Sequence, residues 1–152
     1  SVDTPIRRLD GVTYWVIEEP DAIHDFINTE IRKEWEQDAR SENRDPENDA
    51  WLKTLADREW SLLVMEIEKV QLSPEIMGYV DEATGCIFAE SLDKRRRLLE
   101  REIRDFSVVI WPLIVRGEDM QLVDGYCRFS TLKALGVVKT YVYVGSVGRD
   151  RA

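Results

Sequence analysis

Residues with phosphate-binding chemistry gather in one short stretch of the sequence, residues 120–145. An apolar run ends at Val123 and is followed by Asp124 and Gly125, after which a helix is expected to begin near Tyr126. The first amides of a helix have no partner inside it, and the helix dipole behind them favours an anion. We therefore expect an anion site at this turn, with phosphate as the expected anion.

The side chains of the same stretch add donors and a carboxylate. Arg128 can fork onto phosphate oxygens, and Ser130 and Thr131 add hydroxyl donors. Each of these residues also has a structural alternative. Arg128 could be an exposed first-turn arginine, and the two hydroxyls could only support the helix start. Asp124 could orient a metal or a substrate hydroxyl, or it could cap the helix amides. Cys127 is either a small buried residue or a nucleophile whose thiol is activated by the helix start.

Composition indicates an ordered domain with an uneven charge. The 152 residues suit one domain with at most a small second lobe, and a hydrophobic content of 43% is enough for a core. Residues 18–50 hold twelve acids against four bases, a net charge of −8 in a chain whose total is −9. This acidic segment opposes non-specific attraction to nucleic acid, so DNA is a disfavoured partner.

The apolar runs and the cysteines of the sequence indicate the cellular compartment and whether a structural metal site is expected. No apolar run is long enough to span a membrane and no secretory leader opens the sequence, so we expect a cytoplasmic protein without membrane contact. Cys86 and Cys127 are two lone cysteines without a CxxC pair. They suit a reducing compartment and predict neither a disulfide framework nor a structural zinc site.

The elements expected to position the turn are read from periodicity. A strand is expected over 12–17, and apolar residues at three-to-four spacing predict an amphipathic helix over 20–38. A mobile polar loop over 39–49 and a shorter helix over 51–60 are expected to follow. A strand is expected over 62–67, with its continuation to 72 left open, followed by irregular chain over 73–89 and a helix over 90–106. The last part is expected to contain strands over 108–116 and 120–123, a helix over 126–136, and a strand over 138–144.

The helix expected over 90–106 carries a basic face. It is formed by Lys94, Arg95, Arg96, Arg97, Arg101 and Arg104. The ordinary interpretation is a solvated face paired with nearby glutamates. Contact with a nucleic-acid backbone, or with the acidic segment of the same chain, is the alternative.

From about Met65 to Gly145 this order of elements resembles the ParB/sulfiredoxin superfamily. The resemblance is carried by MEIEKVQL and PLIVRGEDMQLVDGYCRFSTLKALG, and DGYCRFSTLKALG is similar to the turn of free-serine kinases in that superfamily. It implies an α+β fold with a small mixed sheet and flanking helices. We expect residues 1–62 to form an acidic helical extension packed on that core, 63–145 to form the core, and 146–152 to be a flexible tail.

The resemblance also implies a ligand. It places the phosphates of ATP, ADP or CTP with Mg²⁺ at this turn, with Gly125 and Arg128 at the matching phosphate-binding positions and Asp124 as the preceding acid. The implied nucleotide site comprises Gly125, Tyr126, Cys127, Arg128, Ser130 and Thr131. Kinase members use a carboxylate after the first strand, for which Glu75 is the nearest match at a shifted spacing. Glu75 and Asp124 are the candidate catalytic residues, and no metal ligand is assigned.

Departures from the family pattern leave several functions open. Tyr126 occupies the position of the sulfiredoxin catalytic cysteine, and Cys127 replaces the His or Arg found before the arginine in many members. The leading hypothesis is a nucleotide-binding domain that transfers phosphate to a small hydroxyl substrate, with Glu75 accepting the proton. The alternatives are a ParB-like DNA-associated or regulatory module without its own catalysis or helix-turn-helix region, and a degenerate site on a domain that only scaffolds partners.

Overall fold

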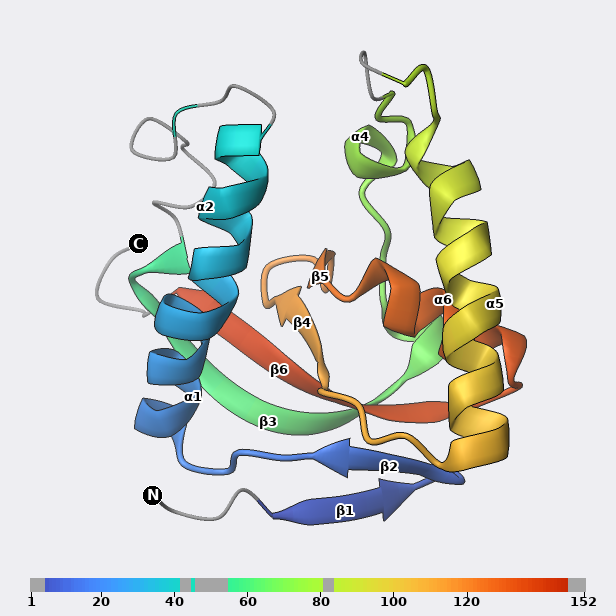
Figure 1. Cartoon of the computed structure of the whole chain (residues 1–152). Helices are drawn as coiled ribbons and strands as arrows, with labels where there is room; N and C mark the ends of the chain where they lie inside the picture. The colour runs from blue at the N-terminus through green and yellow to red at the C-terminus, as the bar shows by residue number, and fades with distance from the viewer. Residues whose placement is uncertain (1–4, 42–44, 46–54, 81–83, 148–152) are drawn as a thin grey trace.

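A four-stranded mixed sheet forms the centre of the computed structural model, which describes residues 5–41, 45, 55–80 and 84–147 (Figure 1). Strand β6 runs antiparallel to β3 and parallel to β4, and β5 runs antiparallel to β4. The fold is of the predicted α+β class. In sheet order the strands are β3 (Arg58–Glu66), β6 (Lys139–Val147), β4 (Leu113–Arg116) and β5 (Leu122–Asp124).

Helices cover both faces of this sheet (Figure 1). Successive strand residues point to opposite faces, so a strand buried on both sides is apolar throughout. In β4, Leu113 and Val115 belong to one buried cluster and Ile114 to the other. One face carries α1 (Pro20–Phe26), η1 (Ile27–Ile31) and α2 (Arg32–Ser41), and the other carries α5 (Phe88–Phe106) and α6 (Tyr126–Ala134).

A two-stranded hairpin, β1 (Ile6–Leu9) and β2 (Val12–Trp15), lies below the sheet in the view of Figure 1. Its turn places Asp10 and Gly11 at φ of 51° and 81°, the left-handed conformation that tight hairpins require. The Asp10 carboxylate accepts a hydrogen bond from the backbone N–H of Val138 at 2.7 Å. The hairpin turn is thereby joined to the start of β6, and β1 is an element that the periodicity did not predict.

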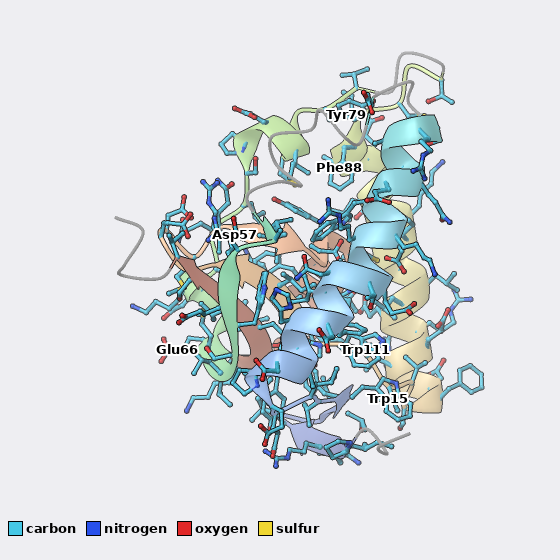
Figure 2. All side chains as sticks on the ribbon, turned by 90° about the vertical axis from the view of Figure 1, so that its left-hand side faces the viewer. Trp15, Asp57, Glu66, Tyr79, Phe88 and Trp111 are labelled. Carbon is cyan, nitrogen blue, oxygen red and sulfur yellow. The ribbon has the colours of Figure 1, made fainter. Side chains whose placement is uncertain are left out.

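Aromatic rings join the hairpin to the first helix. The ring of Phe26 in α1 stacks on Trp111 with centroids 4.4 Å apart, and Trp111 lies 6.3 Å from Trp15 of β2. Figure 2 shows the two tryptophans near each other at the lower end of α1. This contact fixes the direction in which α1 leaves the hairpin.

The first helical segment contains one turn of π-helix, and this turn keeps a single face buried. Twelve residues of an ideal α-helix make three and one-third turns instead of three. Side chains spaced by four residues would therefore point a little further away from the core at each step. Within η1 the N–H of Arg32 donates to the carbonyl of Ile27, five residues back, and the wider turn reverses part of that rotation. The face directed to the core has the four-residue spacing Ile23, Ile27, Ile31, Trp35 and Ala39.

Deleting the exposed Thr29 should be tolerated, because the buried residues would then follow the ordinary amphipathic spacing of four, three, four and four. We expect the free energy of unfolding to change by no more than about 0.5 kcal/mol, as for a surface change. Inserting an alanine after Thr29 should rotate Trp35 by about 100° and lower the free energy of unfolding by roughly 2–3 kcal/mol. Urea denaturation of the two variants measures this, and equal losses would contradict the role given to η1.

Two expected boundaries were wrong, for one physical reason. A helix was expected as far as residue 60 and a flexible tail from residue 146, but Arg58–Trp60 pair with Gly145–Val147 and extend both β3 and β6. Pairing of segments distant in sequence overrides weak local preferences. The boundary expected between residues 62 and 63 therefore falls inside β3. Residues 51–54 and 148–152, and most of the loop expected over 39–49, lie outside the described residues, although α2 continues to Ser41.

Other elements differ from the expectation in extent. The strand expected over 108–116 is reduced to β4, because Pro112 has no N–H for a ladder bond. Strand β3 ends at Glu66, and a short 3₁₀ turn, η3 (Ile67–Lys69), follows in place of a strand to residue 72. The segment expected to be irregular contains α4 (Pro74–Met77), whose first turn is capped by the Ser73 hydroxyl.

The turn between β4 and β5 is held by two ion pairs. Arg116 donates to both oxygens of Asp119 at 2.8 and 2.7 Å. Arg58, which is buried in β3, binds both oxygens of Glu118, with Nη2 to Oε2 at 2.8 Å. The N–H of Gly117 donates to the carbonyl of Gly145 at 2.7 Å. The turn that leads into β5 is thus fixed to β3 and β6.

The Arg116–Asp119 pair should make stability depend on acid pH. Its hydrogen bonds to Arg116 lower the pKa of the Asp119 carboxyl from 3.8 to about 2. A lowered carboxyl pKa stabilises the folded state above the ordinary value, and this stabilisation is lost as the pH falls through the lowered one. We expect Asp119→Asn to lower the melting temperature at neutral pH and to match the wild type near pH 2. Thermal unfolding across pH tests this, with the exposed Asp105→Asn of α5 as control. A difference between wild type and Asp119→Asn that does not change with pH would contradict it.

Candidate functional site

Gly125 is the residue on which the turn between β5 and α6 depends. Its φ of 107° is left-handed, and a Cβ there would lie 2.8 Å from Nη2 of Arg128 and 3.0 Å from Leu113. Its carbonyl accepts the first helical hydrogen bond, from the N–H of Phe129 at 2.7 Å. Among the described residues no side chain caps the start of α6. The amides ahead of that first bond are therefore left to a ligand or to water.

Arg128 lies against this turn and is largely buried. Its side chain is 21% exposed, which excludes an exposed first-turn arginine. Nη2 donates to the carbonyl of Pro112 at 3.1 Å and lies 3.7 Å from Oδ2 of Asp124. The buried Nε has no hydrogen-bond partner among the described residues. The guanidinium is thus placed beside the α6 amides with part of its donor capacity unused.

Asp124 is turned toward the N-terminal helix. Its Oδ1 accepts a hydrogen bond from the indole N–H of Trp35 in α2 at 3.4 Å. Asp124 therefore does not cap α6, which was one of the two roles considered for it. Trp35 is a site residue that the sequence reasoning assigned only to a packed helix. The only sequence signal for Trp35 was its four-residue spacing from Ile31. That spacing predicts that Trp35 is buried, but it does not indicate which residue Trp35 contacts.

Glu34, the residue before Trp35, brings a second carboxylate to the site. Although Glu34 is an exposed residue, desolvation of its carboxyl raises its pKa, the negative charge of Asp124 raises it further, and the positive charge of Arg128 opposes both. Sequence reasoning missed Glu34, because one acid in an acidic helix carries no distinguishing signal. The turn thus has one guanidinium and the carboxylate of Asp124, with the carboxylate of Glu34 near enough for their charges to act on its pKa.

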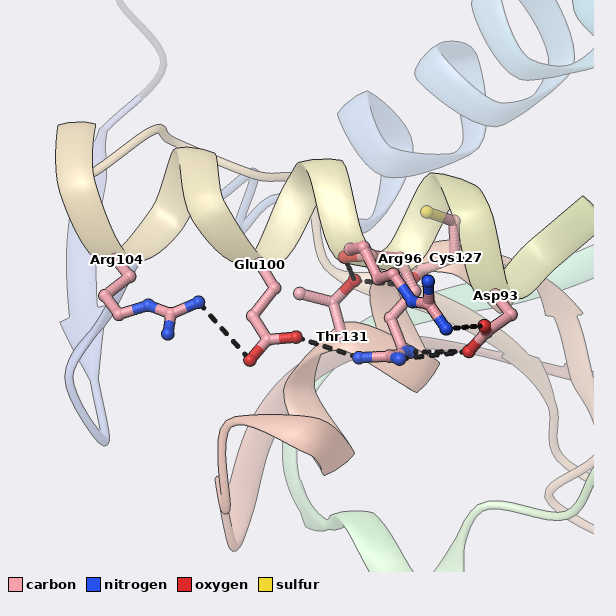
Figure 3. Close-up of polar contacts among 7 residues, drawn as sticks. Asp93, Arg96, Glu100, Arg104, Cys127 and Thr131 are labelled. Carbon is pink, nitrogen blue, oxygen red and sulfur yellow. Dashed lines mark hydrogen bonds and ion pairs between the residues drawn. The ribbon is translucent and has the colours of Figure 1, made fainter.

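Two of the predicted nucleotide-binding side chains are used inside the protein. The Tyr126 hydroxyl accepts a hydrogen bond from the N–H of Ser73 at 3.1 Å and donates to the carbonyl of Leu122 at 3.0 Å. The Thr131 hydroxyl donates to the carbonyl of Cys127 at 2.7 Å, and its side chain faces α5 beside Arg96 (Figure 3). These hydroxyls stabilise the surroundings of the turn, and Tyr126 can offer a ligand only its amide.

The remaining predicted residues lie at or near the turn with less definite roles. Cys127 is a half-buried free thiol, and Ser130 is half-buried one turn further along α6. Glu75 is exposed in α4, which stands on the opposite side of the turn from α2 (Figure 1). No hydrogen bond or ion pair joins Glu75 to the described residues of the turn.

The carboxylates at the turn determine how a metal ion could be held there. Among the described residues, no group of three or more His, Cys, Asp or Glu could hold a metal ion. Mg²⁺ commonly uses only one or two protein carboxylates and completes its shell with phosphates and water. Asp124 and Glu34 are the carboxylates at this turn that could take part in such a shell.

Three of the six basic residues of the α5 face form ion pairs within the helix. Arg96 binds Asp93 at 2.9 Å and Glu100 at 2.8 Å, Arg97 binds Asp93 at 2.9 Å, and Arg104 lies 3.5 Å from Glu100 (Figure 3). This favours the solvated-face interpretation over a nucleic-acid contact.

None of the helices in the described part of the chain is long and apolar enough to cross a membrane.

Comparison with known proteins finds a likeness in fold only. No protein-family model matches the chain, and no curated protein matches it. Two similar solved structures are both pNOB8-like ParB N-domains, one of them in a different crystal form. They have 24% and 22% identity and TM-scores of 0.42 and 0.41, and each alignment covers 62% of this chain. The chain spans about a third of the length of these structures, at 33% and 31%. A likeness this low decides nothing about ligand or activity, and it does not support the resemblance to the kinases.

Glu34→Gln should relieve a charge cost at the site. Because the pKa of Glu34 is raised, ionisation costs the folded state stability as the pH rises above the ordinary value of 4.5. Asp124, Asp38 and Glu30 increase that cost and Arg128 reduces it. We expect Glu34→Gln to melt above the wild type at neutral pH and to lose this advantage below pH 4.5. Thermal unfolding across pH measures it, with the exposed Glu59→Gln of β3 as control. An advantage that persists in acid would contradict this origin.

Proposed function

We propose that the β5–α6 turn binds the phosphates of a nucleotide as its magnesium complex. The observation that carries the proposal is the meeting, at one glycine turn, of the uncapped amides of α6 with the guanidinium of Arg128. Helix amides and an arginine fork are the two protein groups best suited to phosphate oxygens.

The carboxylates set the form of the ligand. A free phosphate approaching the turn would meet the charges of Asp124 and Glu34, which lie close enough for Asp124 to raise the pKa of Glu34. A magnesium ion bound to the polyphosphate would turn this repulsion into attraction. ATP, ADP and CTP with Mg²⁺ are the ligands that fit.

Phosphotransfer is the further step of this proposal. The hydroxyl oxygen of a small acceptor would attack the γ-phosphorus of ATP, the bond to the bridging oxygen would break, and ADP would leave. Amides and Arg128 would stabilise the charge on the transferred group. Glu75, from α4 across the turn, would accept the proton of the hydroxyl. The exposure of Glu75 leaves it accessible to such an acceptor.

Thermal unfolding with ATP, ADP, CTP and GTP, each with and without magnesium, tests the proposal. A ligand at a hundred times its dissociation constant adds about 2.7 kcal/mol, which for a domain of this size raises the melting temperature by roughly 5–11 °C. We expect such a rise with a magnesium nucleotide, its loss on chelation of the metal, and its loss in Arg128→Ala. Because Arg128 also binds the Pro112 carbonyl, the quantity compared is the ligand-induced rise within each variant.

The exposed Arg101→Ala of α5 is the matched control and should retain the full rise. No rise with any nucleotide, or an undiminished rise in Arg128→Ala, would reject the site. Binding without turnover of any hydroxyl acceptor would reject the phosphotransfer step and support a regulatory ParB-like binding module.

A further inference from the structure

We infer that Trp35 of α2 is a positioning residue for Asp124, and this inference rests on the proposed nucleotide site. Trp35 belongs to the N-terminal helical segment, which covers the opposite face of the sheet from α6. Its indole N–H donates to Oδ1 of Asp124 at 3.4 Å. Through this bond a segment 89 residues earlier in the chain sets the direction of a carboxylate at the site.

The direction of Asp124 matters because the carboxylate is a potential competitor. It directly precedes Gly125, and the start of α6 has no side-chain cap. A carboxylate that turned toward the α6 amides would occupy the place of a phosphate. The indole holds Oδ1 away from the helix start, while Oδ2 lies 3.7 Å from Nη2 of Arg128. In that position the carboxylate remains beside the turn and is available to a magnesium ion.

The position of Trp35 is fixed by the core that also fixes the end of β5. Trp35 packs against the buried cluster that contains Ile31 of η1 and Val123 of β5, and Val123 is the residue before Asp124. The π turn of η1 keeps Trp35 on the same face as Ile31. The indole and the carboxylate are therefore held by one rigid contact between helix and strand, so little conformational freedom is lost when their hydrogen bond forms.

Replacing the indole with a phenyl ring isolates the hydrogen bond. Trp35→Phe retains an aromatic ring in the core and removes the donor, so Asp124 becomes free to turn onto the α6 amides. We expect affinity for the magnesium nucleotide to fall about tenfold, as for a hydrogen bond to a charged group. Trp15→Phe, another half-buried tryptophan that packs on Trp111, is the matched control and should bind as the wild type does.

A double-mutant cycle separates positioning from general loosening of the fold. If Trp35 acts through Asp124, Trp35→Phe should have no further effect on affinity in the Asp124→Ala background, which lacks the acceptor oxygens. A purely structural role would reduce affinity by the same factor in both backgrounds, and that result would overturn the inference.

Nuclear magnetic resonance provides a readout that needs no ligand. In the ¹H–¹⁵N spectrum of the full chain, Asp124→Ala should shift the indole resonance of Trp35 and leave those of Trp15 and Trp111 in place. An unmoved Trp35 resonance would overturn the inference whether or not nucleotide binds. If the wild type binds no magnesium nucleotide, the proposed function fails and the spectrum alone decides the contact. If it binds, and Arg128→Ala abolishes binding while Trp35→Phe does not weaken it, only the inference on Trp35 fails.

Discussion

The burial of the central strands on both faces is the constraint on which the rest of the structure depends. In β4, β5 and β6 alternate side chains enter two separate cores, so each face of the sheet requires its own helical cover. Helices α5 and α6 cover one face, and the α1–η1–α2 segment covers the other. The acidic N-terminal segment is therefore a structural layer of the same domain, and its apolar stripe is as necessary to the sheet as the strands themselves.

The same constraint brings the candidate site together. Strand β5 is short, and its last residue, Asp124, emerges between the two helical layers. Gly125 then turns the chain sharply into α6, and the absence of a Cβ there leaves room for the guanidinium of Arg128. One layer thus supplies amides and a cation, while the other supplies Trp35 and Glu34.

Local sequence signals predicted the elements whose structure is decided by nearby residues. The helix expected over 90–106 matches α5 closely, and the Gly125 turn with its following helix lies where expected. The errors fall where distant segments meet: β3 begins at Arg58 because β6 pairs with it, and Ile110 pairs with β2 instead of extending β4. The π turn also escaped prediction, since four-residue spacing alone reads as an ordinary amphipathic helix.

The sequence by itself determined that this is an ordered α+β domain with an unusual helix start at Gly125 and an arginine in its first turn. The α+β class rested on the family resemblance, whereas the ordered domain and the helix start at Gly125 follow from composition, periodicity and the conformational freedom of glycine. Only the tertiary structure decided that Trp35 meets Asp124, that Arg128 lies on the Pro112 carbonyl, and that Tyr126 and Thr131 direct their hydroxyls inward. The reason is physical: each of these contacts depends on which helix covers which face of the sheet. That choice is made by the packing of the whole chain and leaves no mark in any short stretch of it.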